Sequence, residues 1–156
     1  PRPSASSRSS SWVPTKRGDA RRVVALAQPK AGERVVDLGC GTGGVLAAFV
    51  VRGCLVEGWE LAVLPWLVSR WRLRKHRDAS IHFGDFWNVR IEADIVYVFL
   101  MPKTLERLVG KLRSDLHPGA RVISYAFPIP GLTPVTVDKV PGRPTLYLYE
   151  ILSDQK

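Results

Sequence analysis

Cysteine is scarce in this sequence, which has only Cys40 and Cys54 among its 156 residues. A small secreted scaffold stapled by disulfides needs more cysteines than this. We expect these two at opposite ends of neighbouring parallel strands, about 17 Å apart, which is too far for a disulfide. The three histidines, His76, His82 and His117, lack metal-ligand spacing with them. The sequence therefore predicts neither a structural disulfide nor a bound metal.

Long apolar runs are also missing. The longest, residues 45–51, is broken by Arg52, whereas a membrane-spanning helix needs about 18 apolar residues or more. No secretory signal core follows the N-terminal segment PRPSASSRSSS. We therefore expect a soluble, cytoplasmic protein without a membrane partner. Residues 1–11 are predicted to form a flexible basic tail, and residues 12–156 a single domain.

Acidic residues are outnumbered, with 14 Asp and Glu against 23 Lys and Arg, for a net charge of +9. Such a surface attracts nucleic acid, an anionic protein or a charged cofactor, although a merely basic soluble protein has the same composition. The densest basic segment is SRWRLRKHR, residues 69–77. It fits a solvated helix C-terminus or an RNA-binding patch, with cations at Arg70, Arg72, Arg74, Lys75 and Arg77.

The order of apolar patterns predicts an α/β fold. Helical periodicity covers residues 17–28, 43–52, 61–76 and 102–116, and short apolar runs predict strands at 34–38, 55–59, 80–84, 93–100 and 120–127. Residues 133–140 and 143–151 predict a closing antiparallel hairpin. We expect a three-layer, doubly wound, mostly parallel seven-stranded sheet, thinly covered after the third and fifth strands. Trp66 and Trp71 are predicted to cover the sheet as core residues.

The glycine-rich stretch VVDLGCGTGG, residues 35–44, follows the first predicted strand. Gly39, Gly41 and Gly44 fit the G-x-G-x-x-G spacing of a dinucleotide site. Asp37, Gly39, Gly41 and Gly43 fit the D-x-G-x-G-x-G spacing of an S-adenosylmethionine site. In either case the glycines permit a sharp turn and a close approach to a ligand. The glycines alone do not choose between the two cofactors.

Three acidic residues at successive strand ends favour S-adenosylmethionine. The carboxylate of Asp37 repels a pyrophosphate but suits a ligand that carries an ammonium and a sulfonium. Glu60 ends the second strand, where it can accept hydrogen bonds from ribose hydroxyls. Asp85 is placed to accept from the adenine amine, and Phe86 to flank the adenine ring. Carboxyl ends of parallel strands form the ligand crevice of such sheets.

The stretches VVDLGCGTGG, VEGWE and GDF together resemble class I, Rossmann-like S-adenosylmethionine-dependent methyltransferases. Four further stretches, WVPT, DIVYVFLMP, PGARVISYAFPIPG and LYLYEI, resemble the small archaeal and bacterial broad-specificity protein-lysine methyltransferases and their mitochondrial relatives. The resemblance implies that Thr15 joins the cofactor cleft and that the end of the fourth strand lines the substrate cleft. Residues expected at the cofactor are Thr15, Asp37, Gly39, Cys40, Gly41, Gly43, Glu60, Leu61, Asp85 and Phe86.

Methyl transfer to a lysine requires a neutral amine, whose ordinary pKa is about 10.4. An apolar cleft lowers the pKa of the amine by desolvation. Tyr97 and Tyr125 are the candidate catalytic residues, either orienting the amine or taking its proton, although both also fit half-buried strand tyrosines. The cleft is predicted to be lined by Leu100, Met101, Pro102 and Phe127.

Three functions follow from these patterns. The first is a protein-lysine N-methyltransferase that turns S-adenosylmethionine into S-adenosylhomocysteine. The second is an RNA methyltransferase, which the charge favours, although FLMP stands where amino-group base methylation expects N/D-P-P-Y/F. The third is a non-catalytic S-adenosylmethionine-binding module. The sequence leaves open the acceptor, the number of methyl groups added and the oligomeric state.

Overall fold

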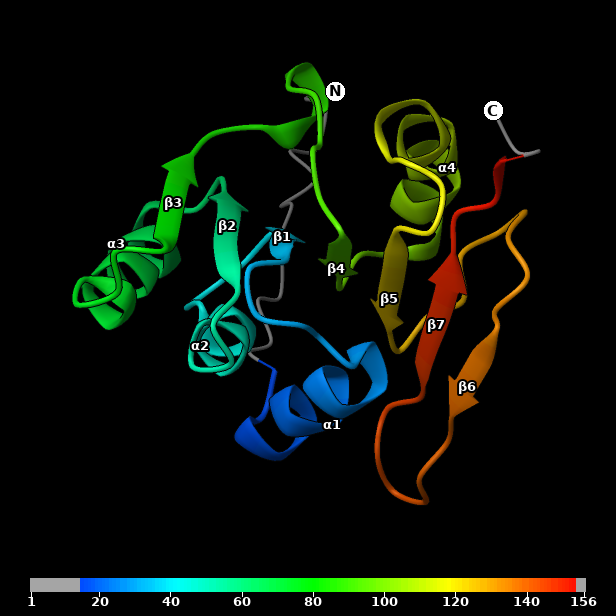
Figure 1. Cartoon of the computed structure of the whole chain (residues 1–156), viewed down its shortest axis with the longest axis horizontal. Coiled ribbons are helices and arrows are strands. Elements are labelled where there is room, and N and C mark those ends of the chain that lie inside the picture. Colours follow the sequence, from blue (N-terminus) through cyan, green and yellow to red (C-terminus); the bar gives the residue numbers. More distant parts are fainter. Residues whose placement is uncertain (1–14, 154–156) are drawn as a thin grey trace, which may run out of the picture.

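The computed structural model describes residues 15–153, which fold around one seven-stranded sheet with the strand order β3-β2-β1-β4-β5-β7-β6 (Figure 1). Strands β1 to β5 are parallel, and β7 pairs antiparallel with both β5 and β6. The elements in chain order are α1 (Arg17–Ala27), β1 (Arg34–Leu38), α2 (Gly44–Val50), β2 (Leu55–Glu60), α3 (Val63–Leu73), β3 (Ala79–Phe83), η1 (Phe86–Asn88), β4 (Ile95–Val98), α4 (Pro102–Asp115), β5 (Arg121–Tyr125), β6 (Thr136–Asp138) and β7 (Leu146–Glu150).

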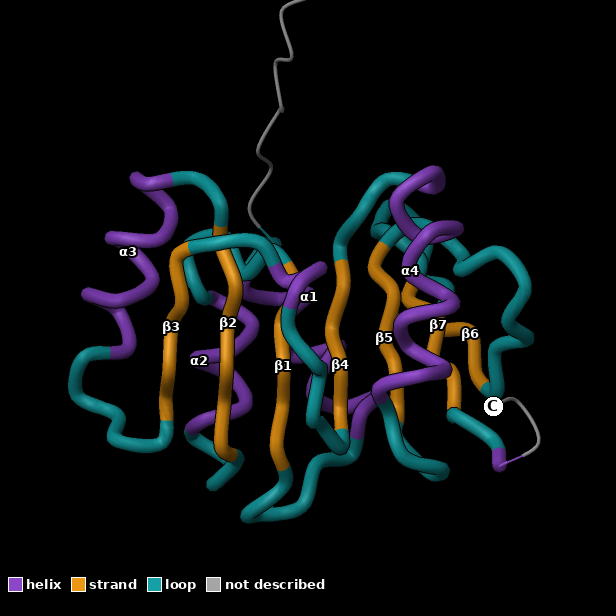
Figure 2. Tube along the Cα trace, turned by 90° about the horizontal axis from the view of Figure 1, so that it is seen from above, coloured by secondary structure: helices purple, strands orange, loops and turns teal. Residues whose placement is uncertain are grey.

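Alternate residues of the central strands build two separate cores. Val35 of β1 packs beneath α1 and α2, whereas Val36 and Leu38 pack beneath α4. Because successive side chains of a strand point to opposite faces, continuous burial along β1 and β4 requires cover on both sides. Helices α1 and α2 provide it on one face, with α3 beside them at the β3 edge, and α4 provides it on the other (Figures 1 and 2). The predicted three-layer, mostly parallel arrangement with its closing hairpin is confirmed.

The two short connections predicted from the sequence are real. Between β3 and β4 the chain forms only the single 3₁₀ turn η1, and no helix separates β5 from β6. Ile91 in the first connection is buried, and its backbone N–H donates to Asp115 at the end of α4 at 3.0 Å. The loop is thereby fastened to the helix, so that α4 and residues 84–94 together cover this face (Figure 1).

Helix α3 departs from its prediction as a core helix. Only Ser69 and Leu73 of this helix are buried. Trp71 is 66% exposed and Trp66 is half-buried, so the pair does not cover the sheet as predicted. The helix lies at the β3 edge of the sheet, where only the side that faces β3, β2 and α2 is covered (Figure 1). The near-helical spacing of the two tryptophans therefore indicated a helix, but it did not show whether their side chains are buried.

The remaining sequence predictions concern the N-terminal tail, membrane-spanning helices, the two cysteines and the end of β4. The predicted tail, residues 1–11, lies outside the described residues. Within residues 15–153 no helix is both long and apolar enough to cross a membrane. Cys40 and Cys54 are both buried free thiols. Strand β4 is shorter than predicted and ends at Val98, which leaves residues 99–101 as a loop at the sheet edge.

Gly58 provides a test of the packing under the sheet edge. A Cβ at this position would lie 2.7 Å from both Cys40 Sγ and Leu46 Cδ1. We expect Gly58→Ala to lower the free energy of unfolding by about 1–3 kcal/mol, as overpacking does. Gly110→Ala in α4 is the matched control, since nothing lies within 4 Å of its added Cβ. Urea denaturation should find this control unchanged or up to about 1 kcal/mol more stable; equal losses in both variants would contradict the packing argument.

Candidate functional site

The predicted glycine turn lies at the carboxyl end of β1. Gly39, Gly41 and Gly43 have φ angles of 91°, 53° and 74°, a backbone region that residues with a Cβ rarely adopt. The turn is fastened from below, since the backbone N–H groups of Gly39 and Cys40 both donate to Trp59 O at 2.9 Å. Three of the predicted cofactor residues therefore share one tight turn that leads directly into α2.

Glu60 joins this turn to the next strand. One carboxylate oxygen accepts from the backbone N–H of Gly41 and the other from that of Ala62, each at 2.8 Å. These bonds fix the Glu60 carboxylate beside the glycine turn. Each carboxylate oxygen keeps a further lone pair, so a ligand hydroxyl can still be accepted.

Asp37 is the most unusual group of the site. Its side chain is 2% exposed, and its Oδ1 atom has no hydrogen-bond partner within the part of the chain that the structure describes. Burial raises the pKa of Asp37 well above its ordinary value, and the nearby Glu60 carboxylate raises it further. A buried carboxylate without a partner costs free energy, which a cationic ligand beside it would recover.

The remaining predicted cofactor residues are split by the structure. Asp85 is exposed after β3, and its carboxylate accepts from the backbone N–H of Trp87 at 3.0 Å. Phe86 differs from its prediction as a ring beside adenine, because it is only 7% exposed and packs in the core beneath α4. It anchors the segment that carries Asp85. Leu61 is 63% exposed at the start of the next connection.

Cys40 faces away from a ligand and into the protein. It packs over Gly58, and burial raises the pKa of its thiol, with the Asp37 and Glu60 carboxylates adding to the shift. An uncharged, enclosed thiol is a poor nucleophile and a poor metal ligand. Cys40 therefore supports the turn from beneath, and only its backbone belongs to the glycine turn.

A row of polar side chains continues from Asp37 across the same face of the sheet. Tyr97 of β4 lies in register with Asp37, and its hydroxyl is 3.0 Å from Thr15 Oγ1. Burial raises the pKa of Tyr97 well above its ordinary value, and the charge of Asp37 raises it further. The structure thus brings together Thr15, Tyr97 and Asp37, which the sequence predicted from three distant segments.

Tyr125, at the end of β5, belongs to a buried ion network. Its hydroxyl donates to Asp19 Oδ2 at 2.8 Å, and Asp19 Oδ1 accepts from Arg143 at 3.0 Å and Arg22 at 3.2 Å. Burial and the bond to Asp19 raise the pKa of Tyr125 to about 12. Tyr125 can therefore accept a hydrogen bond, but it is a weak general base at neutral pH.

A pocket of about 360 Å³ lies beside Tyr125, between α1, the ends of β4 and β5, and the turn between β6 and β7. Ala126 in its wall has a φ of 70°, and its N–H donates to Thr145 O at 2.8 Å. Of the predicted cleft residues, Phe127 lines this pocket. The sequence did not predict the other lining residues, which are Lys16, Asp19, Phe99, Ala126, Gly142, Arg143 and Pro144.

One other predicted cleft residue, Leu100, lies near the glycine turn. A Cβ built on Gly39 would lie 4.0 Å from Leu100 Cδ2, so this leucine faces the turn. Met101 is 64% exposed and caps α4, and Pro102 is the first residue of that helix. Leu100 therefore stands at the glycine turn, while Phe127 stands at the pocket.

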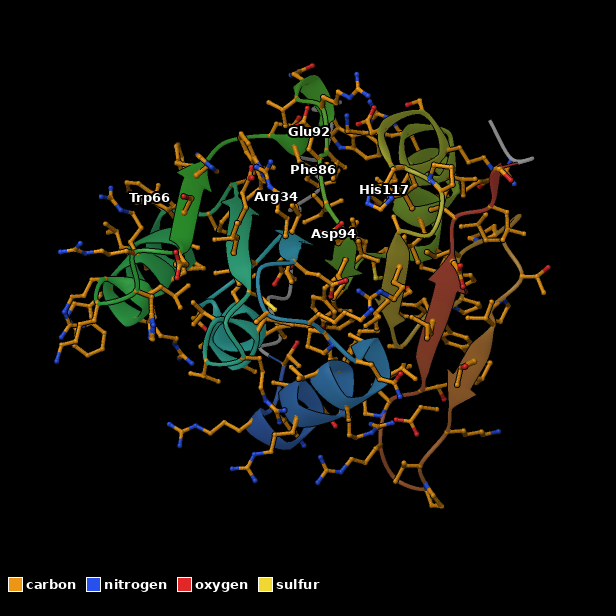
Figure 3. All side chains as sticks on the ribbon, in the orientation of Figure 1. Arg34, Trp66, Phe86, Glu92, Asp94 and His117 are labelled. Carbon is orange, nitrogen blue, oxygen red and sulfur yellow. The ribbon has the colours of Figure 1, made fainter. Side chains whose placement is uncertain are left out.

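The opposite edge of the sheet is occupied by paired charges. Arg34 forms an ion pair with Glu92 at 3.6 Å, and its backbone N–H donates to Asp94 at 2.8 Å. His117 lies 3.0 Å from the other oxygen of Asp94 (Figure 3). Groups of this kind have partners within the fold, whereas Asp37 at the carboxyl edge has a buried oxygen without a hydrogen-bond partner among residues 15–153.

Comparison with known proteins identifies the family of the chain. Residues 37–136 match the family model of the ANTKMT methyltransferase domain. A protein-lysine N-methyltransferase of Saccharolobus islandicus is 35% identical over 149 residues, which cover 90% of this chain and 92% of that protein. The chain belongs to this methyltransferase family.

Two further relatives extend the comparison. An adenine nucleotide translocase lysine N-methyltransferase of Mus musculus is 38% identical over 133 residues, covering 81% of this chain and 57% of that protein. An RNA methyltransferase from Salinibacter ruber, solved with S-adenosyl-L-homocysteine, is 25% identical with a TM-score of 0.84, covering 90% and 95% of the two chains. The chain spans 51–60% of the length of the vertebrate relatives it matches.

The residues of this methyltransferase domain fit S-adenosylmethionine. The unpartnered Asp37 oxygen suits a cationic ligand group, and Glu60 and Asp85 offer acceptors for hydroxyl and amine donors. The glycine turn allows a ligand to approach the backbone closely. Among residues 15–153 no group of three His, Cys, Asp or Glu side chains is arranged to hold a metal ion.

The Asp19 network gives a prediction about acid stability. Burial favours the neutral acid, but the hydrogen bonds from Tyr125, Arg143 and Arg22 outweigh it and hold the pKa of Asp19 below its ordinary 3.8. A lowered pKa stabilises the fold above pH 4, and this contribution disappears as the pH falls through the lowered value. We expect Asp19→Asn to cost about 2–3 kcal/mol at pH 7, somewhat less than a fully buried pair, because Arg143 is half exposed.

The measurement is urea denaturation of the original protein and of Asp19→Asn, from pH 7 down to pH 2.5 or to the lowest pH at which both are folded. The difference in free energy of unfolding should shrink below about pH 4. A difference that stays constant with pH would show that Asp19 acts by packing alone.

Proposed function

We propose that this protein transfers methyl groups from S-adenosylmethionine to lysine side chains of a protein substrate. The observation that carries the proposal is the unpartnered, buried Asp37 oxygen beside a turn of three left-handed glycines. The relatives named as lysine N-methyltransferases support the choice of acceptor.

Asp37, Glu60 and Asp85 hold the cofactor in this proposal. Asp37 pairs with its ammonium group, Glu60 accepts from its ribose hydroxyls, and Asp85 accepts from its adenine amine. When bound, S-adenosylmethionine supplies an electrophilic methyl group on a sulfonium centre. The protein orients the acceptor and excludes water, because an in-line displacement needs the two reacting atoms held about 3–3.5 Å apart.

The pocket beside Tyr125 accepts the lysine side chain. Its aromatic walls, Phe99 and Phe127, remove the amine from water and so lower its pKa, which favours the neutral nucleophile. Lys16 and Arg143 line the same pocket, and their positive charges offset the negative charge of Asp19, which would otherwise favour the charged amine. The Tyr125 hydroxyl, whose proton is directed to Asp19, is left to accept a hydrogen bond from the amine.

Proton removal does not require Tyr97 or Tyr125 in this scheme. Both hydroxyls have raised pKa values and existing hydrogen bonds, so we assign them a positioning role. The lysine ammonium gives its proton to bulk water before the neutral amine enters the apolar pocket. Of the two roles predicted for these tyrosines, orienting the amine or taking its proton, the proposal therefore keeps only the orienting role.

RNA is the second candidate acceptor, since a similar solved structure is named an RNA methyltransferase. The basic segment 69–77 would then bind the nucleic acid. However, this segment forms the C-terminal half of α3 and the turn after it, next to β3, whereas the pocket lies beside β5 and the hairpin, toward the other end of the strand order. The two features therefore do not form one continuous acceptor surface, and we favour a protein acceptor.

Tritiated S-adenosylmethionine incubated with the protein and a cell extract distinguishes these acceptors. We expect macromolecular label that survives RNase, disappears on protease treatment and is recovered as methyl-lysine after acid hydrolysis. Label that survives protease and is lost with RNase would establish the RNA acceptor. Cofactor binding without transfer to any fraction would support the non-catalytic module.

Asp37→Asn tests the cofactor site itself. We expect the affinity for S-adenosylhomocysteine in calorimetry to fall about 10- to 100-fold, the range of a charge-assisted hydrogen bond worth about 1.5–3 kcal/mol. The ligand-free variant should have a higher Tm at neutral pH, because the raised pKa of Asp37 makes its ionisation destabilising there. Unchanged affinity, or a lower Tm without ligand, would contradict this assignment.

A further inference from the structure

One face of α3 is apolar, exposed and turned away from the rest of the protein. At about 100° per residue, its apolar residues cover a continuous arc of roughly 140°. The opposite side is packed, because Ser69 and Leu73 lie within 3.4 Å of a Cβ built on Gly43. The exposed residues are Val63 (55%), Leu64 (75%), Leu67 (49%), Val68 (41%) and Trp71 (66%).

Cations border this apolar arc on both sides. On the same helical projection, Arg70 lies along one border and Arg72 along the other, and Arg74, the C-cap of the helix, projects just inside the Arg70 border. The guanidinium of Arg74 lies over the Trp71 ring at 4.2 Å, and that of Arg70 over Trp66 at 5.1 Å. Lys75 and Arg77 follow, and residues 61–77 contain no Asp or Glu. Figure 3 shows nitrogen-tipped side chains extending outward from α3.

The apolar surface continues past the helix toward the carboxyl edge of the sheet. Leu61, directly after Glu60, is 63% exposed, and Phe83 at the end of β3 is 52% exposed. The ring of Phe83 lies 5.4 Å from that of Trp66, which connects the strand end to the helix. We call this surface, residues 61–77 with Phe83, the α3 face.

We propose that the α3 face docks the protein on an anionic lipid bilayer. The helix would lie in the plane of the interface with its apolar arc among the acyl chains and its arginines at the phosphates. A helix with a wide apolar face, flanking Arg residues and an interfacial Trp has the composition that binds in this way. This revises the expectation of no membrane partner, and it is independent of methyl transfer.

Other occupants of the α3 face fit the observations less well. RNA offers no partner for the aliphatic side chains of Val63, Leu64, Leu67 and Val68, and one face of the Trp71 ring is covered by Arg74. A second copy of this chain would place the same patch opposite itself in a two-fold interface. The clustered cations, which have no acid among them, would then repel one another. A bilayer of negative charge satisfies both the apolar and the cationic groups.

Vesicle sedimentation tests the proposal. The full chain is mixed with vesicles of phosphatidylcholine alone or of equal parts phosphatidylcholine and phosphatidylglycerol. We expect binding at least about tenfold stronger to the anionic vesicles, decreasing with added salt. Leu64→Ser/Leu67→Ser/Trp71→Ser and Arg70→Gln/Arg72→Gln/Arg74→Gln should each lose at least about tenfold in affinity.

A matched variant controls for net charge. Arg17→Gln/Arg21→Gln/Lys103→Gln removes three exposed cations from α1 and α4, and it should bind nearly as well as the original protein. Equal binding to both vesicle types, or an equal loss in this control, would overturn the proposal. Protein that forms a dimer through Trp71, or binds RNA through the arginines, while ignoring vesicles would overturn it as well.

A second measurement does not depend on the triple variants folding. Trp71→Phe keeps the apolar character of the position, so it should still sediment with anionic vesicles. It should lose most of the blue shift in tryptophan emission that the original protein shows on binding. An undiminished shift in this variant would mean that Trp71 does not enter the bilayer, which contradicts the proposed docking of the apolar arc.

Discussion

The Glu60 carboxylate fixes the part of the molecule on which the candidate site depends. It accepts backbone hydrogen bonds from Gly41 in the turn after β1 and from Ala62 at the start of α3. The turn and the helix are thereby set relative to each other by one side chain. Gly58, opposite Asp37 in the sheet register, leaves the space into which Cys40 packs beneath the same turn. The cofactor side of the site and the exposed face of α3 therefore share a single anchor.

Two buried carboxylates on one face of the sheet have opposite electrostatic situations. Asp19 is surrounded by donors from α1, β5 and the hairpin turn, and it behaves as a stable anion that holds these segments together. The Oδ1 atom of Asp37 is buried without such a donor in the part of the chain that the structure describes, so ionisation of this carboxyl group is costly unless a cation lies beside it. Asp19 therefore stabilises the fold, whereas the cost of ionising Asp37 would be offset only by a bound cation.

The sequence was most informative where a function depends on neighbours in the chain. Glycine spacing, Asp37 and the acid that ends β2 lie within one local pattern each, so the turn and the two strands beside it could be predicted, whereas the order of the strands in the sheet could not. The Asp19–Tyr125 bond joins residues 106 positions apart, and no local pattern announces it. Helical periodicity likewise identified the apolar side of α3 but not its exposure, because exposure depends on what the rest of the chain leaves uncovered. Phe86 was predicted to contact the cofactor because it follows Asp85, but its ring packs in the core beneath α4.

The left-handed backbone at Ala126 limits how the pocket can change. A φ of 70° is open to glycine and tolerable for small residues, but it excludes β-branched side chains. Substitutions that reshape the pocket are therefore easier at its other lining positions, such as the aromatic rings at positions 99 and 127 and the turn that carries residues 142–144. Under the proposed function, ring size and turn length would be the means of changing the acceptor preference of this protein.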